Sequence, residues 1–570
     1  MTRTAPATTM NKTSAIGFAL ATLALPSFAQ EDIFSQGGRS AGGRFGSSIA
    51  GGFDVDGDGL ADFVVGEPYE NRLGPMTGAV RVVSGANGAD IYLRGGNSAY
   101  DLFGASVALG DLDGDGRAEF IVGAYGDDSN GTDSGTVFVY SGASGNLLYT
   151  LTGDEGDHFG FSISFVPDTN GDGRGDFVVG ARAADTNGNN SGAALLFSGL
   201  DGTLLHEFGG EAAFDLFGSA VAGCVDLDGD GLGDLICGAY LNDAQGSGAG
   251  RAYVYSGASG SLLFTLQGTG VGDAFGYAVD DAGDVNGDGA SDLIVGAPSN
   301  DTSFQNAGQA SVYSGVDGTL LMVVNGDAPG DNFGSTVAGS LRIDGDGLDD
   351  FMVGTIASDA NGVSSGMVRL FAGLDGSELA TLLGSSPGAR LGSALCSAGD
   401  MDLDDNTELL IGAWGEDGGA GAFSGVVHLV AFAAPSTLFN SYCNSNLNSL
   451  GVAATISAVG SNSLASGDLE LVADGLLANQ TGLFFHGSNQ VQFPFGDGFL
   501  CVAGQLFRYG IVAADAVGQA RLLVDYAAPP VAANQITAGS QWNFQFWYRD
   551  NHSSNAGFNL TDAMALTFAP

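Results

Sequence analysis

Lysine is almost absent from this chain, since Lys12 is the only one among 570 residues. If an N-terminal segment is removed, the mature chain has no lysine, which excludes catalysis by a lysine amine. Lys and Arg together number 17 against 65 Asp and Glu, so the formal net charge is −48. A surface of this sign repels phosphate backbones, and we therefore expect no nucleic-acid partner.

Histidine, long apolar runs and helix-period patterns are also scarce. The five histidines have no paired spacing that indicates a catalytic base. After the N-terminus, no stretch reaches the ~20 apolar residues that a transmembrane helix needs. We therefore expect a soluble chain that is not an enzyme and has no transmembrane segment.

The N-terminus has the order of a secretory signal. Arg3 and Lys12 precede the apolar run 15–25, and Ser27-Phe28-Ala29 provides small residues for cleavage before Gln30. The sequence thus predicts a signal peptide over residues 1–29 and a secreted or cell-surface protein.

Cysteine is rare, with five residues in all. Cys443 and Cys501 lie in the same C-terminal region and are the first choice for a disulfide in an oxidising compartment. Cys224 and Cys237 flank one acidic loop on opposing strands, so they could form a bridge or remain buried thiols. Cys396 aligns with Ala222 and is expected in the core.

Glycine is abundant, with 96 residues, and marks an internal repeat. Phe-Gly pairs recur every 56 or 58 residues and end with Leu391-Gly392; they begin at Phe45, Phe103, Phe159, Phe217, Phe275 and Phe333. Each pair precedes an acidic loop, an apolar triplet, a Gly-Ala-Pro-like step and two further strand patterns. Seven units of four strands predict an all-β, seven-bladed β-propeller over residues 30–434.

The first and last units complete each other. The segment Asp32-Ile33-Phe34-Ser35-Gln36 stands as far before Phe45 as residues 146–150 stand before Phe159, whereas the last unit lacks a fourth strand after residues 426–430. We predict that residues 31–37 form the closing strand of blade seven.

The acidic loops carry carboxylate or amide oxygens at positions 1, 3, 5 and 9, and the carbonyl of residue 7 adds another oxygen. Calcium takes six to eight such ligands, and the loop glycines allow the tight turn. Five loops have this pattern: Asp54, Asp56, Asp58, Leu60 and Asp62; Asp111, Asp113, Asp115, Arg117 and Glu119; Asp168, Asn170, Asp172, Arg174 and Asp176; Asp226, Asp228, Asp230, Leu232 and Asp234; and Asp284, Asn286, Asp288, Ala290 and Asp292.

Two later loops depart from the pattern. The sixth keeps Asp344, Asp346 and Asp350 but has Arg342 in place of the first ligand. The seventh has lost both glycines and keeps Asp400, Asp402, Asp404 and Glu408. The sequence therefore predicts about five calcium sites.

Together, the Phe-Gly/Gly-Ala-Pro units and their Asp-x-Asp-Gly-Asp-Gly-x-x-Asp loops resemble the FG-GAP repeats of the integrin α-subunit head. The resemblance covers about residues 31–434. It implies a calcium-stabilised propeller that serves protein contacts and adhesion. This chain differs in having its best loops in the first five units, whereas integrin α chains carry theirs in later blades.

Residues 435–570 lack the repeat. Alternating segments such as 466–473 and 541–548 predict a β-sandwich. The opening Tyr-Cys and the run 542–550 are similar to a C-terminal module of exported proteins from planctomycete-like bacteria. Alternating Trp542, Phe544 and Phe546 could line a sugar site, but we expect them to fill a core.

Strand parity places the acidic loops on one face of the propeller and the loops that join strands two and three on the other. That second face carries Tyr125, Arg182, Tyr240 and Trp414, which are residue types enriched in protein interfaces. The alternative is that they pack between blades. Arg174-Gly175-Asp176 spells an adhesion tripeptide, but we assign Asp176 to the third loop rather than to a receptor.

These observations favour an exported calcium-binding scaffold whose second face recognises an extracellular protein or cell-surface glycan. The alternative function is a calcium-dependent polysaccharide-binding or polysaccharide-lyase propeller. The sequence does not identify the partner or the oligomeric state.

Overall fold

The computed structural model describes residues 21–22, 29–401, 406–433, 439–442, 454–459, 469–495, 498–504, 506–515, 518–524, 536, 540–549 and 558–567. Its regular elements are all β-strands, which confirms the predicted fold class. Two compact units divide the chain, one holding Gln30–Phe432 and the other Ala433–Pro570. Within the described ranges, no helix is long and apolar enough to cross a membrane.

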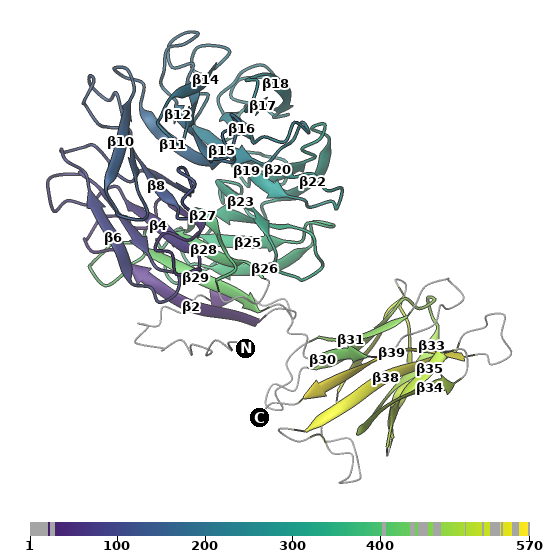
Figure 1. The fold of residues 1–570 in the computed structure, drawn as a ribbon. Helices are drawn as coiled ribbons and strands as arrows, with labels where there is room; N and C mark the ends of the chain where they lie inside the picture. Colours follow the sequence, from purple (N-terminus) through teal and green to yellow (C-terminus); the bar gives the residue numbers. More distant parts are fainter. Residues whose placement is uncertain are drawn as a thin grey trace. The chain divides into compact units, whose positions relative to one another are not determined.

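The described residues of the first unit form seven antiparallel sheets, and in each of the first six the strands follow chain order (Figure 1). The first three consist of β3 (Ile49–Phe53), β4 (Asp62–Glu67), β5 (Ala79–Val83) and β6 (Asp90–Gly95); β7 (Ser106–Gly110), β8 (Glu119–Ala124), β9 (Thr136–Tyr140) and β10 (Leu147–Thr152); and β11 (Phe159–Val166), β12 (Asp176–Ala181), β13 (Ala193–Ser198) and β14 (Leu204–Gly209).

The next three sheets consist of β15 (Ala220–Cys224), β16 (Asp234–Ala239), β17 (Arg251–Ser256) and β18 (Leu262–Gln267); β19 (Ala278–Gly283), β20 (Asp292–Ala297), β21 (Gln309–Tyr313) and β22 (Leu320–Asn325); and β23 (Thr336–Leu341), β24 (Asp350–Thr355), β25 (Met367–Phe371) and β26 (Glu378–Leu383). The short β1 (Ala21–Thr22) pairs with the edge of β26.

The seventh sheet joins the two ends of the unit. Its strand order is β2 (Ala29–Gly37), β29 (Val426–Ala433), β28 (Glu408–Ala413) and β27 (Leu391–Gly399). The strand from the start of the unit, which includes the predicted closing segment 31–37, therefore lies beside the last strand.

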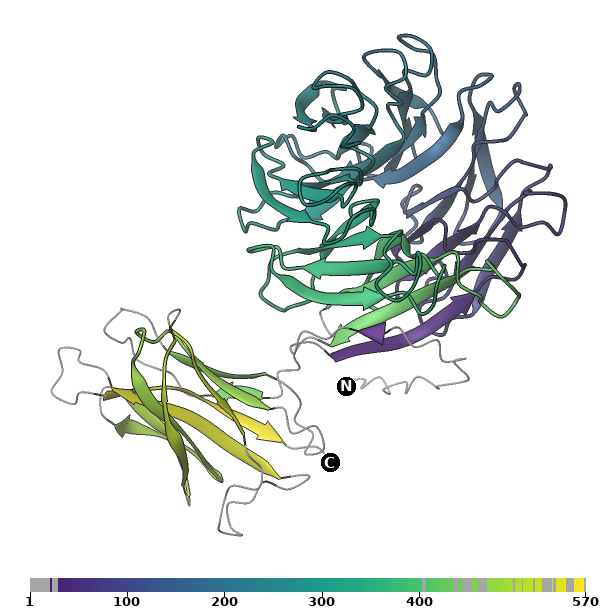
Figure 2. The ribbon, with the colours of Figure 1, turned by 180° about the vertical axis from the view of Figure 1, so that it is seen from behind.

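The sheets form a closed ring. The first strand of each sheet contacts the first strand of the next, and β27 contacts β3. Figure 1 shows β11, β15, β19, β23 and β27 around the centre, with β10, β14 and β18 at the periphery, and Figure 2 shows the same ring from behind. The arrangement is a β-propeller, as the repeat predicts.

Burial explains the repeated apolar triplet. All six residues of β4, β8, β12, β16, β20, β24 and β28 are buried, because these second strands are covered on both faces by neighbouring sheets. The fourth strands lie at the outer edge and are partly exposed, as in β10. β-Branched and aromatic residues suit both environments.

The two signature motifs bind each other through the main chain. In the second repeat, the Gly104 N–H donates to the Gly123 carbonyl (2.9 Å), so the Phe-Gly pair is fixed to the Gly-Ala-Pro-like step of its own unit. The phenylalanine connects to the preceding unit: the Phe217 N–H donates to the Ser191 carbonyl (3.0 Å), and Phe217 forms a parallel bridge with Gly192. The repeat thus carries its own blade-to-blade connection.

The second unit is built from separate sheets. A five-stranded sheet has the order β30 (Phe439–Tyr442), β39 (Phe558–Thr567), β38 (Gln541–Arg549), β33 (Thr481–Gly487) and β36 (Phe507–Ala513). A three-stranded sheet contains β31 (Thr455–Val459), β32 (Glu470–Asp474) and β37 (Ala520–Leu523), and a hairpin contains β34 (Asn489–Phe495) and β35 (Gly498–Ala503).

Residues of both larger sheets share one apolar cluster. It includes Ile456 and Leu471 from the three-stranded sheet and Trp542, Phe544 and Phe546 from β38. Phe544 and Phe546 are fully buried and Trp542 is 6% exposed, so these aromatic residues fill a core rather than line an open site.

Candidate functional site

Five acidic loops connect the first and second strands of the first five sheets, so strand order places them on one face of the ring. Three of them bring three carboxylates together: Asp54, Asp56 and Asp58; Asp111, Asp113 and Asp115; and Asp226, Asp228 and Asp230. In each triplet one oxygen per residue lies within 4.8 Å of the others. Oxygen atoms that each lie 2.3–2.6 Å from one calcium ion are at most about 5.2 Å apart, so these triplets fit that ion.

Main-chain amides hold the carboxylates in place. In the fourth loop, the Asp226 carboxylate accepts hydrogen bonds from the Gly229 N–H (2.6 Å) and the Gly231 N–H (2.7 Å). Asp228 accepts from the Asp230 N–H (3.1 Å), and Asp230 accepts from the Leu232 N–H (2.9 Å). The loop backbone thus preorganises three like charges, which favours a cation between them.

The third and fifth loops have asparagine at the third position. The Asn170 amide oxygen accepts the Asp172 N–H (3.0 Å), and its amide nitrogen lies 3.2 Å from Asp176 Oδ1. Asn286 has the same contacts with Asp288 (2.9 Å) and Asp292 (3.1 Å). Each of these two loops offers one carboxylate fewer than the other three.

The ninth-position carboxylate has a structural role that sequence reasoning missed. Asp62 is fully buried and accepts the Val55 N–H (2.8 Å) with one oxygen and the Gly85 N–H (3.0 Å) with the other. It therefore ties the loop to the turn between strands three and four. Equivalent bonds hold Glu119, Asp176, Asp234, Asp292 and Asp350.

Burial raises the pKa of these ninth-position carboxyls, while the donated amide hydrogen bonds act in the opposite direction. The pKa of Asp62 rises to about 6 and that of Glu119 to about 7. The pKa of Asp234 and that of Asp292 each rise to about 6 for the same reason.

In the sixth loop, the Arg342 side chain pairs with the eighth position of the loop and not with a ligand position. Arg342 pairs with Asp349 (3.1 Å between Nε and Oδ1) and is exposed. Asp350 nevertheless keeps its bonds to the Ile343 and Gly373 amides. In the seventh loop Glu408 accepts a hydrogen bond from the Met401 N–H. Asp402 and Asp404 lie outside the described residues.

Neighbouring loops are joined by main-chain hydrogen bonds. The first-position carbonyl of one loop accepts an N–H from the eighth position of the next. These bonds are Ala118 to Asp54 (2.8 Å), Gly175 to Asp111 (3.2 Å), Gly233 to Asp168 (2.8 Å), Asp349 to Asp284 (3.1 Å) and Thr407 to Arg342 (2.9 Å). These bonds connect the first four loops to one another and the last three loops to one another.

The Arg174-Gly175-Asp176 tripeptide is not presented to a receptor. Asp176 is fully buried, and its carboxylate accepts hydrogen bonds from the Thr169 N–H (2.9 Å) and the Gly199 N–H (3.1 Å). These contacts support a structural role for Asp176 within the third loop and not a role in receptor binding.

The four residues predicted for partner binding lie on the opposite face, directly after the second strands. All four are half-buried. Tyr125 contacts Phe161 of the next sheet (5.2 Å between ring centroids), and the Arg182 guanidinium lies 3.7 Å from the same ring. Tyr240 contacts Tyr277 (5.2 Å), whereas Trp414 lies beside Arg44 (4.4 Å). These side chains pack between sheets and also reach the surface.

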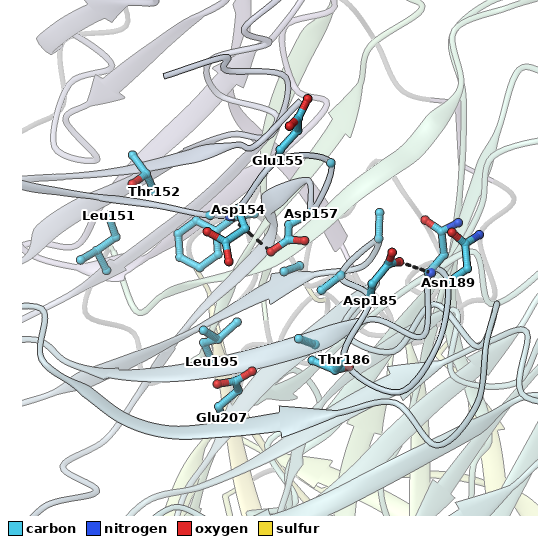
Figure 3. Close-up of a pocket in the computed structure, with 18 of the residues that line it drawn as sticks. Leu151, Thr152, Asp154, Glu155, Asp157, Asp185, Thr186, Asn189, Leu195 and Glu207 are labelled. Atoms are coloured by element: carbon cyan, nitrogen blue, oxygen red, sulfur yellow. Dashed lines mark hydrogen bonds between the residues drawn. The ribbon is translucent and has the colours of Figure 1, made fainter. Parts of the chain in front are cut away.

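A pocket of about 800 Å³ opens between the second and third sheets. Its lining comes from the end of β10, the following loop 153–157, the loop 183–190 and strands β13 and β14 (Figure 3). Five carboxylates line it, from Asp154, Glu155, Asp157, Asp185 and Glu207, together with Thr152, Thr186, Asn189 and Asn190. Sequence reasoning missed this pocket because two different repeats form it.

The cysteines of the fourth sheet are free thiols. Cys224 pairs with Asp234, three residues before Cys237, so the two side chains point to opposite faces of the sheet. They belong to different core clusters. Cys501 is disulfide-bonded, and its predicted partner Cys443 lies outside the described residues.

One inner strand carries an unusual acidic pair. Asp280 and Asp281 occupy β19 where β15 has Ala222 and Gly223. The Gly339 N–H donates to the Asp280 carboxylate (3.3 Å). Burial, assisted by the neighbouring Asp281 charge, raises the pKa of Asp280 to about 7.

We expect Asp280→Ala to change the pH dependence of stability. A carboxyl whose folded pKa is about 7 and whose unfolded pKa is 3.8 favours the native state while it is neutral, and this contribution is lost as pH rises from about 4 to about 7. At pH 8 the variant should therefore be more stable by on the order of 2 kcal/mol, with no gain at pH 4. Urea unfolding across this range measures the effect, with Asp280→Asn as the isosteric comparison. A difference that is constant with pH would contradict it.

The FG-GAP repeat family matches residues 45–83, 103–140, 159–197, 217–255 and 275–313. Each match begins at a Phe-Gly pair and ends in the third strand of a sheet. The five matches therefore cover the five loops that have the complete acidic pattern.

Curated relatives include integrin α subunits. The chain is 32% identical to integrin alpha-6 of Gallus gallus over 198 residues, which are 32% of this chain and 18% of that protein. It is 32% identical to integrin alpha-V of Gallus gallus over 228 residues (37% and 22%) and to integrin alpha-5 of Xenopus laevis over 237 residues (38% and 22%). The chain thus spans about a fifth of the length of these relatives.

Among solved structures, the crystal structure of BBS1N in complex with ARL6DN, soaked with lead, matches 70% of this chain and 96% of its own chain. The TM-score is 0.43 and the identity is 11%. The five repeats and the similarity to integrin α subunits show that the chain is an integrin α-like FG-GAP repeat protein.

Proposed function

We propose that this chain is an exported calcium-binding scaffold that recognises an extracellular protein and so serves cell adhesion. One observation carries the proposal: preorganised acidic loops occupy one face of the ring, and aromatic and arginine side chains occupy the other. The two faces are linked through the buried second strands, which run from the acidic loops to the opposite edge.

Calcium would be structural in this scheme. Asp54, Asp56 and Asp58, and the equivalent residues of the other loops, would hold the ion, which neutralises like charges within each loop. The sites contain only oxygen donors, which suits a hard cation such as calcium. The hydrogen bonds between neighbouring loops would then hold each ion in a rigid frame.

The proposal is tested by capturing partners from the native cell envelope, with calcium and with chelator. Tyr125→Ala should weaken binding of the captured partner by about 30-fold, because truncating an aromatic residue of this kind in a protein interface costs about 2 kcal/mol. Val316→Ala is the matched control, because Val316 is 58% exposed in a turn between strands three and four on the acidic face. Calcium-independent capture, or equal loss in both variants, would refute the proposal.

The pocket between the second and third sheets favours a second candidate function, polysaccharide binding. Its carboxylates, amides and hydroxyls are the groups that hydrogen-bond sugar hydroxyls. An activity screen on acidic polysaccharides tests the lyase form of this alternative, since neither a protein scaffold nor a polysaccharide-binding propeller produces turnover.

A further inference from the structure

On the second face, two arginines share one tryptophan ring. The Arg44 guanidinium lies 4.4 Å and the Arg390 guanidinium 4.8 Å from the centroid of the Trp414 ring. Arg44 also lies 4.1 Å from the Tyr69 ring. Arg390 lies in the connection from the sixth sheet to the seventh, and Arg44 lies in the connection from the seventh sheet to the first. Trp414 and Tyr69 follow the second strands of the seventh and first sheets, so the cluster lies where the ring closes.

Neither guanidinium has an anionic partner within the described residues. The arginine ion pairs in this part of the chain involve other arginines, such as Arg39, Arg72 and Arg369. The nearest acidic residue in sequence to Trp414 is Glu416, which is 3% exposed and bonds to Ser385 (2.7 Å) and His428 (3.2 Å) instead.

The repeat pattern shows that this sector differs from the others. In five repeats, an aspartate stands two residues before the phenylalanine: Asp101, Asp157, Asp215, Asp273 and Asp331. In the first and last repeats that position holds Gly43 and Ala389, and the next residue is Arg44 or Arg390. The loss of the aspartate and the gain of an arginine make the surface around Trp414 more positive than the rest of this face.

Stacking prepares the arginines for an anion. A guanidinium that lies over an aromatic ring uses its flat face and keeps its N–H donors in the plane, where they can bind a carboxylate in a bidentate fashion. The structure gives no side-chain hydrogen bond for Arg44 or Arg390 to another described residue. Phe423, 6.4 Å from Trp414 and 49% exposed, adds an apolar surface beside them.

We propose that Arg44 and Arg390 bind a carboxylate-bearing, partly apolar segment of the partner protein. This inference rests on the proposed function and names the chemistry of the same face. A protein segment fits better than a glycan, because the two guanidiniums cover the Trp414 ring on which a sugar would stack. Charge complementarity selects an acidic segment, and its apolar residue covers Phe423.

The probe is a glutamate-rich dodecapeptide that contains two leucines, with a twin in which every Glu is Gln. With the full chain in calcium, the twin should bind at least about tenfold more weakly, because it makes no charge-assisted hydrogen bond. Arg44→Gln/Arg390→Gln should lose the acidic peptide by a similar factor. The binding should also weaken as salt rises.

Arg94→Gln is the matched control. Arg94 also stacks on tyrosines, at 5.2 Å from Tyr92, but its guanidinium donates to the Gly145 and Leu93 carbonyls. This variant should bind like the wild type. The comparison of peptide with twin uses the wild-type chain, so it decides the question even if the double variant fails to fold.

Three outcomes would overturn the inference: equal binding of peptide and twin, equal loss in Arg94→Gln, or preference for oligogalacturonate over the peptide. Failure of the proposed function is distinct. If Tyr125→Ala abolishes partner capture and the double arginine variant does not, the scaffold function stands and the acidic-segment inference fails.

Discussion

Chelation of divalent cations should lower the melting temperature of the repeat unit by about 10 °C or more. Each ion bound at 100 times its Kd stabilises the native state by about 2.7 kcal/mol, and five loops have the full pattern. Without the ions, three carboxylates within 4.8 Å of one another repel. Calorimetry in calcium, and in chelator at matched ionic strength, measures the shift.

A pair of variants assigns the effect to the loops. Asp228→Ala removes the third-position ligand of the fourth loop and should lower the melting temperature in calcium but hardly in chelator. Asp344→Ala alters the equivalent position of the sixth loop, where Arg342 replaces the first ligand, and should show no calcium-dependent change. Equal melting of the wild type with and without chelator would count against structural calcium.

Gly192→Ala should lower the free energy of unfolding by about 4 kcal/mol or more, because the substitution combines strain with a clash. Gly192 has φ +84°, and a Cβ at this position would lie 2.1 Å from the Phe217 carbonyl oxygen. The main chain on both sides is fixed, since the Phe217 N–H bonds to Ser191 and the Gly210 N–H bonds to Gly192. Neither Gly192 nor Phe217 can move without breaking the main-chain contacts that connect the third and fourth sheets.

Gly272→Ala is the control for this variant. Its φ is +83°, but no atom lies within 4 Å of the added Cβ. It should cost only about 1–2 kcal/mol, the penalty of the left-handed conformation for alanine. Urea unfolding at equilibrium compares the two. Similar losses in both variants would show that the Phe217 contact does not matter.

Most of the first unit follows from local sequence. The Phe-Gly spacing fixes the unit, the apolar triplets mark strands that are buried on both faces, and residues 31–37 stand in the register of a fourth strand. These features can be predicted from the sequence because each repeat contains the same motifs at nearly the same spacing. The side of the ring on which each loop lies then follows from the alternation of antiparallel strands.

The role of the ninth loop position was readable but missed. Asp350 persists in a loop that has lost its first ligand, and Glu408 persists in a loop that has lost both glycines, which indicates a task that does not depend on the ion. The opposite directions of Cys224 and Cys237 were readable as well, once Cys224 was paired with Asp234. In contrast, Trp414 and Arg44 are far apart in sequence, so only ring closure brings them together.

The order of the seventh sheet bears on how the unit resists force. β29 leads directly into the second unit, yet it lies between β2 and β28 rather than at an edge. Tension that arrives through residue 433 must therefore shear two ladders at once instead of unzipping one. A scaffold that is pulled through residue 433 would therefore stay folded until the hydrogen bonds of β29 with both β2 and β28 break.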